Sequence, residues 1–322
     1  MPDQRRFLSS SIHISGCVDI LLLLALSGTW LGLLGGLHWA LDLFIHFPWQ
    51  YLFICVAGTV WCFGMKRSIV VKLVCISSLL MNGTSLYRVK GDPSFAEVEG
   101  ERLRVVSLNV LTGNPDKQRV FEYLVSANAD VIFLMEVDSA WATALDSLKE
   151  THPHHLLRTQ EDNFGVALFS RVPLLQAEVF QTSDEAMPSV IARLMHAGRE
   201  MTLVGTHPLP PIGPRLSASR DTQLLAIAGY VKELNTPVLV IGDLNATPWS
   251  QGMRMLRRGN ALGYRSATSP SKPTWKVGTI FAVPIDHALC TPPLTIPRRV
   301  IGPDVGSDHR PQELEVGWQP GA

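Results

Sequence analysis

Charged residues are almost absent from three stretches near the start of this 322-residue chain. The stretches are 17–36, 49–65 and 68–82. Asp19 and Lys72 are their only charged residues. A run of about 20 apolar residues is long enough to cross a bilayer core of roughly 30 Å. The shortage of charge therefore predicts a membrane anchor, residues 1–91, with about three transmembrane helices.

Arg5 and Arg6, which precede the first apolar stretch, are also typical of a secretory signal peptide. No small-residue cleavage pattern follows them, and two further apolar stretches come later in the chain. Three membrane helices are therefore the favoured interpretation.

Lys and Arg are also missing from the loop 37–48, whereas Lys66 and Arg67 lie between the second and third stretches. Cytoplasmic loops carry the excess of basic residues in membrane proteins. The pattern predicts a multi-pass protein of the cell inner membrane, with everything after about residue 85 on the extracytoplasmic side. Arg88 and Lys90 oppose this orientation, and loss of the third span would reverse it.

Residues 92–322 are poor in cysteine and have no excess of basic residues. Cys290 is their only cysteine, which excludes a disulfide within this region and a CxxC metal site. They contain 21 Lys and Arg against 25 Asp and Glu, whereas a nonspecific nucleic-acid binder shows a basic face. Arg254, Arg257 and Arg258 form either a local basic patch or one solvated helix face.

The region 92–322 contains neither repeats nor low-complexity segments, and we interpret it as one domain. Short apolar runs at 102–110, 130–136 and 237–243 read as buried strands, and 217–234 as the longest helix. A capped helix is also predicted from Ser139, a favourable N-cap residue. Strands that alternate with helices and later arrive in pairs predict an α/β domain of mixed sheets covered by helices.

Polar side chains follow several of these apolar runs. Ligands bind at the carboxyl ends of strands in open α/β sheets. Alone, each residue reads as a turn former, but together they supply the carboxylates, amides and imidazoles that hold a hard cation and act on a phosphate. The residues are Asn109, Glu136, His207, Asp243, Asn245 and Asp286, with Asp308 and His309 from the loop before the last strand.

The same residues lie in motifs that occur in the order "SLNV", "LMEV", "FGVALFSR", "THPLPP", "GDLNATPW", "PIDHAL" and "GSDHRP". Across about residues 100–318 the chain resembles the endonuclease/exonuclease/phosphatase family, to which DNase I belongs. The motifs "GDLNATP" and "SDHRP" are the specific part. The resemblance implies a four-layer α/β/β/α sandwich and hydrolysis of phosphate esters with Mg²⁺, for which Mn²⁺ is an alternative.

The resemblance also implies a metal site. Glu136 resembles the main metal ligand of the family, Asn109 lies beside it, and Asp308 belongs to the same environment.

The catalytic roles follow from the same resemblance. Asp243 matches the residue that positions or deprotonates the attacking water, while Asn245 and His207 would donate hydrogen bonds to phosphoryl oxygens. His309 matches the essential histidine, either as a general base or as an electrostatic stabiliser, and Asp286 resembles the carboxylate that orients it.

Three further residues are ambiguous. His287 directly follows Asp286, and we interpret it as structural. Arg215 and Arg220 follow the "THPLPP" motif. They are either substrate-binding groups, since Arg makes bidentate contacts to phosphate, or surface charges on an amphipathic helix.

The sequence therefore predicts a membrane-anchored, Mg²⁺-dependent phosphoesterase that has the lipid bilayer as one partner. Its substrate would be a lipid headgroup, a small phosphodiester or, as an alternative, DNA or RNA. A catalytically inactive binding domain is a further alternative. Such a domain would be expected to lose one of Glu136, Asp243, Asn245 or His309, and all four are present.

Overall fold

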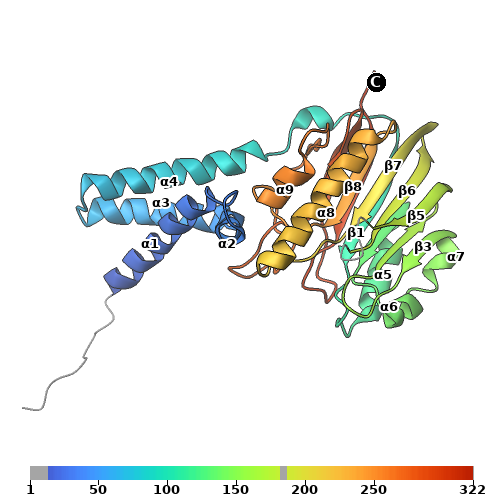
Figure 1. The fold of residues 1–322 in the computed structure, drawn as a ribbon, viewed down its shortest axis with the longest axis horizontal. Coiled ribbons are helices and arrows are strands. Elements are labelled where there is room, and N and C mark those ends of the chain that lie inside the picture. The colour runs from blue at the N-terminus through green and yellow to red at the C-terminus, as the bar shows by residue number, and fades with distance from the viewer. Residues whose placement is uncertain (1–13, 182–186, 322) are drawn as a thin grey trace, which may run out of the picture.

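The computed structural model of the chain describes residues 14–181 and 187–321. Figure 1 shows two parts: a group of helices formed by residues 14–91, and an α/β domain formed by residues 92–321. We call these the helical region and the α/β domain. Arg5 and Arg6, which precede the first apolar stretch, lie outside the described residues.

The helical region contains three long helices with a short bent segment between the first two. The elements are α1 (Ile14–Gly32), α2 (Trp39–Asp42), the 3-10 helix η1 (Leu43–His46), α3 (Pro48–Gly64) and α4 (Ile69–Arg88). Two helices are long and apolar enough to cross a membrane, or three if the pair that is bent by 66° at Phe47 counts as one span. The helices occur at the three stretches predicted to span, and α4 continues to Arg88.

Polar contacts hold the three long helices together. Asn82 on α4 donates to the Thr29 hydroxyl on α1 at 2.9 Å, and the Trp30 indole donates to Ser78 at 3.1 Å. Arg67, before α4, pairs with Asp19 on α1. Away from these contacts the helices expose many large apolar side chains, which suits a lipid environment.

Two mixed sheets form the centre of the α/β domain. One has the strand order β10-β11-β1-β2-β4-β3, and the other has the order β5-β6-β7-β8-β9. The six strands of the first sheet are β1 (Glu99–Asn109), β2 (Val131–Met135), β3 (His154–Arg158), β4 (Val166–Ser170), β10 (Leu294–Ile301) and β11 (Gln312–Trp318). The second contains β5 (Leu174–Phe180), β6 (Ser189–His196), β7 (Arg199–Thr206), β8 (Val238–Asp243) and β9 (Asp286–Cys290).

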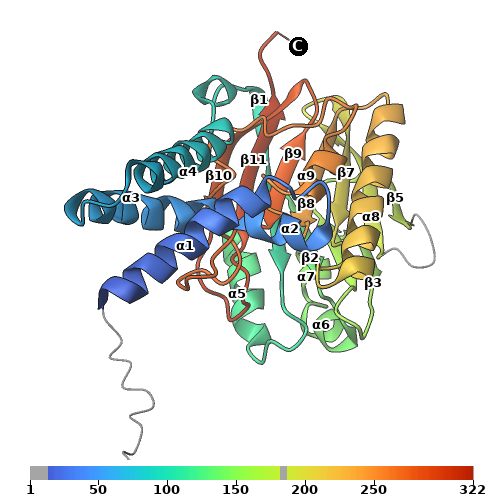
Figure 2. The same ribbon diagram turned by 60° about the vertical axis from the view of Figure 1, so that its left-hand side comes forward.

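The two sheets pack face to face, with helices on their outer faces (Figures 1 and 2). Phe133 on β2 and Leu203 on β7 are among the fully buried residues between the sheets. The helices α5 (Lys117–Ala127), α6 (Ser139–Ala144) and α7 (Leu148–Thr151) cover the first sheet, and α8 (Pro214–Glu233) and α9 (Gln251–Leu256) cover the second. A short 3-10 helix, η2 (Pro93–Phe95), precedes β1. The predicted α/β sandwich of two mixed sheets is confirmed.

One helix differs from its prediction. The N-cap of α6 is Asp138, whose side chain accepts a hydrogen bond from the Trp141 amide at 2.7 Å, and Ser139 is the first helical residue. The helix ends at Ala144 and a separate turn of helix begins at Leu148. Asp and Ser are comparable N-cap residues, so the sequence alone does not choose between two adjacent ones.

The sheet topology brings the predicted polar residues to one edge of the sandwich. Strands β1 and β2 are parallel, so that Asn109 at the end of β1 lies opposite Met135, directly before Glu136. Asp286 does not end a strand, as the sequence suggested, but begins β9. Because β9 runs antiparallel to β8, Asp286 nevertheless pairs with Asp243 at the same edge.

Candidate active site

A cavity of about 700 Å³ lies at this edge of the two sheets. Its lining includes six of the residues predicted from the sequence: Glu136, His207, Asp243, Asn245, Asp308 and His309. Asn109 and Asp286 lie behind them and contact them through hydrogen bonds. The eight residues predicted for catalysis and metal binding therefore form one site.

Glu136 is held in a fixed orientation by three donors. The Asn109 amide donates to Glu136 Oε1 at 2.8 Å, and the Thr112 backbone N–H donates to Oε2 at 3.0 Å. The Thr112 hydroxyl donates to the Glu136 carbonyl at 3.1 Å. Glu136 has a φ of +63°, a conformation that is uncommon outside glycine and is concentrated at functional sites.

Asp243 and Asn245 follow β8 in a tight turn. The Asn245 backbone N–H donates to Asp243 Oδ1 at 2.9 Å, which leaves Oδ2 to face the other site residues. Gly242 permits this geometry because its φ is +139°, and a Cβ there would lie 2.0 Å from the Thr206 carbonyl oxygen. The turn therefore places a carboxylate and an amide side by side at the edge of the cavity.

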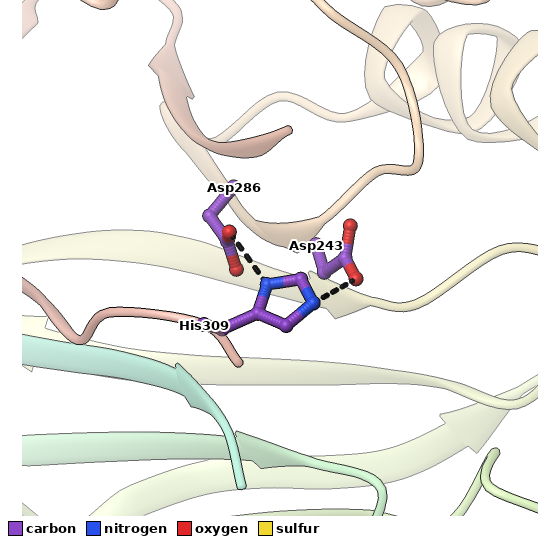
Figure 3. Close-up of side chains that lie close together, drawn as sticks. All are labelled: Asp243, Asp286 and His309. Atoms are coloured by element: carbon purple, nitrogen blue, oxygen red, sulfur yellow. Dashed lines mark hydrogen bonds and ion pairs between the residues drawn. The ribbon is translucent and has the colours of Figure 1, made fainter. Parts of the chain in front are cut away.

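His309 lies between two buried carboxylates, as Figure 3 shows. Its Nδ1 donates to Asp286 Oδ2 at 2.8 Å, and its Nε2 lies 3.5 Å from Asp243 Oδ2. Burial opposes protonation of the imidazole, but the negative charges of Asp286 and Asp243 outweigh burial and raise the His309 pKa to about 10. The imidazole is therefore a cation at neutral pH.

The opposite shift occurs at Asp243. Burial favours the neutral acid, but the charge of His309 and the hydrogen bond from His207 outweigh burial and lower the Asp243 pKa to about 2. Asp243 therefore stays ionised at neutral pH. The Asp243 carboxylate and the His309 imidazolium therefore stabilise each other in the buried site, one as acceptor and the other as donor.

His207 completes the group around Asp243. Its Nε2 lies 3.4 Å from Asp243 Oδ2 and 3.4 Å from the Asn245 amide nitrogen. Its ring packs beside Phe164, with 5.2 Å between the ring centroids. Both His207 and Asn245 lie where they are able to contact a group bound next to Asp243.

Asp308 also lines the cavity. The Trp275 indole donates to Asp308 Oδ2 at 2.8 Å, and the Lys276 ammonium lies 3.2 Å from the same oxygen. Oδ1 has no such partner among the described contacts. Asp308 is thus partly neutralised by Lys276, whereas Glu136 receives only neutral donors.

The donor set fits a hard divalent cation. Glu136 offers a carboxylate at the cavity wall and Asp308 offers a second. The Asn109 amide nitrogen orients the Glu136 carboxylate, while the Asn109 oxygen accepts a hydrogen bond from the Leu111 backbone N–H at 3.0 Å. Carboxylate and amide oxygens suit Mg²⁺ or Mn²⁺. Asp243, Asp286 and His309 also bring ligand atoms within 4.8 Å of one another. A protonated imidazole has no free lone pair for a metal, so we favour the Glu136 side of the cavity.

The two arginines that follow the "THPLPP" motif lie outside the cavity lining. Arg220 is 1% exposed, and its guanidinium contacts Asp221, the Asn245 carbonyl at 3.0 Å and Asp42 at 3.4 Å. It therefore positions the Asn245 turn instead of facing a ligand. Arg215 lies in a neighbouring depression beside Phe164.

Two other groups from the sequence also lie away from the cavity lining. His287 is fully buried and contacts the Tyr264 hydroxyl and the Ala246 carbonyl. These partners are structural contacts. Arg254 pairs with Gln251 and the Trp249 carbonyl, and Arg257 packs on the Tyr264 ring.

The sequence did not reveal four cavity residues, because they belong to the helical region. They are Trp39, Leu43, His46 and Phe47. Their segment has no motif and reads as a short loop between spans. The segment lacks Lys and Arg, and this feature predicts the orientation of the helices but not a place in the active site.

The chain belongs to the endonuclease/exonuclease/phosphatase family, whose model matches residues 106–309. No curated protein matches the sequence. Among solved structures, a family member from Bacteroides vulgatus superimposes with a TM-score of 0.58 at 18% identity, covering 68% of this chain and 100% of its own.

Two other structural neighbours differ in what they act on. TDP2 from D. rerio, solved with a single-strand DNA product, has a TM-score of 0.57 at 19% identity and covers 68% of this chain and 100% of its own. Sphingomyelinase C from Streptomyces griseocarneus has a TM-score of 0.52 at 17% identity and covers 67% and 99%. At these identities the likeness shows the shared fold only.

Proposed function

We propose that the chain is a membrane-anchored, divalent-metal-dependent phosphoesterase that hydrolyses phosphodiester or phosphomonoester bonds by attack of water. The observation that carries the proposal is the convergence of Glu136, Asp243, Asn245, His207 and His309 on one cavity. This set supplies an anionic acceptor, a permanent cation and neutral donors in one place, which are the groups that transfer of a phosphoryl group requires.

Glu136 and Asp308, which both line the cavity, would hold the metal ion, and Asn109 would orient the Glu136 carboxylate. When bound, Mg²⁺ or Mn²⁺ supplies positive charge to the phosphoryl oxygens as the reaction proceeds. The chain itself fixes the Glu136 carboxylate through Asn109 and Thr112, so that the ligand is oriented before any substrate binds.

Asp243 would position the attacking water. Its pKa of about 2 makes it a weak base, so it orients the water in the ground state and accepts the proton only as the new P–O bond forms. The P–O bond to the ester oxygen breaks in the same reaction, and the leaving oxygen takes a proton from solvent. Asn245 and His207, each next to Asp243, would donate hydrogen bonds to the non-bridging oxygens. Fixed donors of this kind stabilise the charge that develops in the transition state.

His309 would act as a cation. With a pKa of about 10 it is protonated before the substrate arrives, so we assign it electrostatic stabilisation of the phosphoryl group and not the role of the base. Asp286 holds the ring through Nδ1. Of the two roles that the resemblance implied for the histidine, this pKa supports electrostatic stabilisation.

The catalytic domain is proposed to lie on the extracytoplasmic side of the cell inner membrane. The loop between α1 and α3, which has no Lys or Arg, and the α/β domain lie at one end of the helices (Figure 2). The connection between α3 and α4, which contains Lys66 and Arg67, lies at the other end. This arrangement agrees with the positive-inside pattern, provided that all three long helices cross the bilayer.

A nuclease is the second candidate. It is favoured by the likeness to TDP2 and opposed by the acidic balance of the domain. The test compares nicking of supercoiled plasmid with hydrolysis of bis-p-nitrophenyl phosphate by the full chain, in Mg²⁺ and in EDTA. Metal-dependent hydrolysis of the small ester without nicking supports a phosphoesterase of small or lipid substrates. Nicking at a comparable rate would favour the nuclease, and no turnover of either by folded protein would contradict catalysis.

A further inference from the structure

We propose that the substrate is a phosphate ester with a long apolar chain, and that the bent segment of the helical region forms the wall on which this chain lies. The inference rests on the proposed phosphoesterase function and adds the class of substrate. We call α2, η1 and Phe47 together the apolar wall, residues 39–47.

The lining of the cavity has two chemically different parts. Glu136, Asp243 and His309 supply its charged and polar groups, whereas a second set of lining residues is apolar. The apolar set consists of Trp39, Leu43 and Phe47 from the apolar wall, with Phe164, Pro210 and Ile212 from the α/β domain. A large apolar surface beside a polar centre is typical of a binding site for an apolar group. Ile212 is 74% exposed, which is a costly state for an isoleucine without a partner.

The charge of the lining distinguishes between substrate classes. None of the described residues that line the cavity is Lys or Arg. Binding of DNA or RNA depends on several basic contacts to successive phosphates. The cavity instead provides for one phosphate and a neighbouring apolar group, which favours a lipid over a nucleic acid.

The apolar wall is attached to the catalytic turn by buried polar contacts. Asp42 pairs with Arg220 at 3.4 Å and accepts a hydrogen bond from the Gln251 backbone N–H at 2.8 Å. Arg220 also donates to the Asn245 carbonyl, and His46 Nδ1 lies 2.9 Å from the Thr247 hydroxyl. These contacts therefore hold the apolar wall in a fixed position beside the catalytic turn.

The position of the wall supplies the route for the substrate. It lies at the end of α1 and at the start of α3, where the helices that are long and apolar enough to span a membrane meet the α/β domain. This is the level at which lipid phosphates lie, and the exposed apolar surface of the helices continues from there. A lipid is thus able to present its phosphate to His309 while its chain stays against the apolar wall.

The test uses two chromogenic diesters, methyl p-nitrophenyl phosphate and dodecyl p-nitrophenyl phosphate, with the full chain in the same detergent micelles and Mg²⁺. Both release p-nitrophenol, so they differ only in the alkyl chain. We expect kcat/KM for the dodecyl ester to exceed that for the methyl ester at least tenfold. Each methylene that leaves water contributes about 0.8 kcal/mol, or roughly fourfold in kcat/KM. Burial of two or three methylenes of the dodecyl chain against the apolar wall is therefore sufficient for this difference.

Enrichment of the dodecyl ester in micelles would mimic this preference, so the variants decide the question. Phe47→Ala should reduce the dodecyl-to-methyl ratio of kcat/KM about fivefold or more. Phe44→Ala is the matched control, because Phe44 belongs to the same segment but does not line the cavity. Leu43→Ala is a second probe of the wall if Phe47→Ala does not fold.

The outcomes separate this inference from the proposed function. Turnover of both esters with a ratio that neither Phe47→Ala nor Leu43→Ala changes relative to Phe44→Ala would overturn the lipid assignment and leave the phosphoesterase in place. Absence of metal-dependent turnover of either ester by folded protein would instead overturn the function on which the inference rests.

Discussion

His309 owes its charge to two carboxylates, and Asp286 is the closer of them, at 2.8 Å. Replacing Asp286 with Asn removes a negative charge that favours the imidazolium, so the His309 pKa falls from about 10. We expect kcat to fall by about 100-fold or more and the loss of activity at high pH to begin at a lower pH. A pH–rate profile measures both effects.

Asp304→Asn is the control for this prediction. Asp304 is an exposed carboxylate in the loop between β10 and β11 that also contains His309, and it pairs with Arg310. Its removal should leave the profile unchanged. An Asp286→Asn enzyme with the wild-type profile would contradict the charge assigned to His309.

Glu136 is the carboxylate that the structure prepares best for a metal ion. Glu136→Gln keeps the shape of the side chain but removes its charge, so the Mg²⁺ concentration for half-maximal activity should rise at least about tenfold, a loss seen even for residues behind the ligands. Titration of the activity with Mg²⁺ measures this concentration. Glu150→Gln, an exposed residue on α7, is the matched control, and an unchanged titration for Glu136→Gln would remove it from the metal site.

The site residues were predictable because each lies in a short motif next to a strand. The motifs alone did not show which strands are neighbours, and therefore which site residues lie opposite each other. Asp286 was expected at the end of a strand and begins one, since antiparallel and parallel neighbours bring opposite strand ends to the same edge. Arg220 was expected to bind substrate or to lie on the surface, but it is buried among Asp42, Asp221 and the Asn245 carbonyl.

At the scale of the elements, the turn after β8 depends on a glycine. Gly242→Ala would place a Cβ 2.0 Å from the Thr206 carbonyl oxygen at a φ of +139°. We expect a loss of stability of more than about 2 kcal/mol, seen as a lower melting temperature. Gly229→Ala, in α8 with nothing within 4 Å of the new Cβ, should instead stabilise by up to about 1 kcal/mol. Equal melting temperatures for the two variants would contradict the geometry of this turn.

The strands were more predictable than the helix ends. A buried run such as 237–243 in the sequence corresponds to β8 (Val238–Asp243), because burial on both faces needs continuous apolar residues. The predicted helix from Ser139 divides into α6 and α7. Its cap belongs to Asp138, since neighbouring Asp and Ser residues have similar N-cap preferences.

For the whole molecule, the proposed orientation in the membrane would decide which lipids or esters the site meets. A reporter that is active only outside the cytoplasm, fused after residue 322, should be active, because Lys66 and Arg67 face the cytoplasm in the proposed orientation. A reporter that is active only in the cytoplasm, fused at the same position, should be silent. The reverse pattern would contradict the orientation and would indicate that only two helices span.

Docking of the helical region on the α/β domain was not predictable from the sequence. Asp42 and Arg220 are separated by 178 positions, and neither lies in a motif that points to the other. The sequence showed only that the loop 37–48 lacks Lys and Arg. In the structure, residues from this loop line the active-site cavity.

The measurement that tests the central claim most directly is hydrolysis of bis-p-nitrophenyl phosphate by the purified full chain, with and without Mg²⁺, beside His309→Ala. The account predicts release of p-nitrophenol that EDTA abolishes and Mg²⁺ restores, with a rate at least about 100-fold lower in the variant. Equal rates for wild type and His309→Ala, or hydrolysis that persists in EDTA, would contradict it.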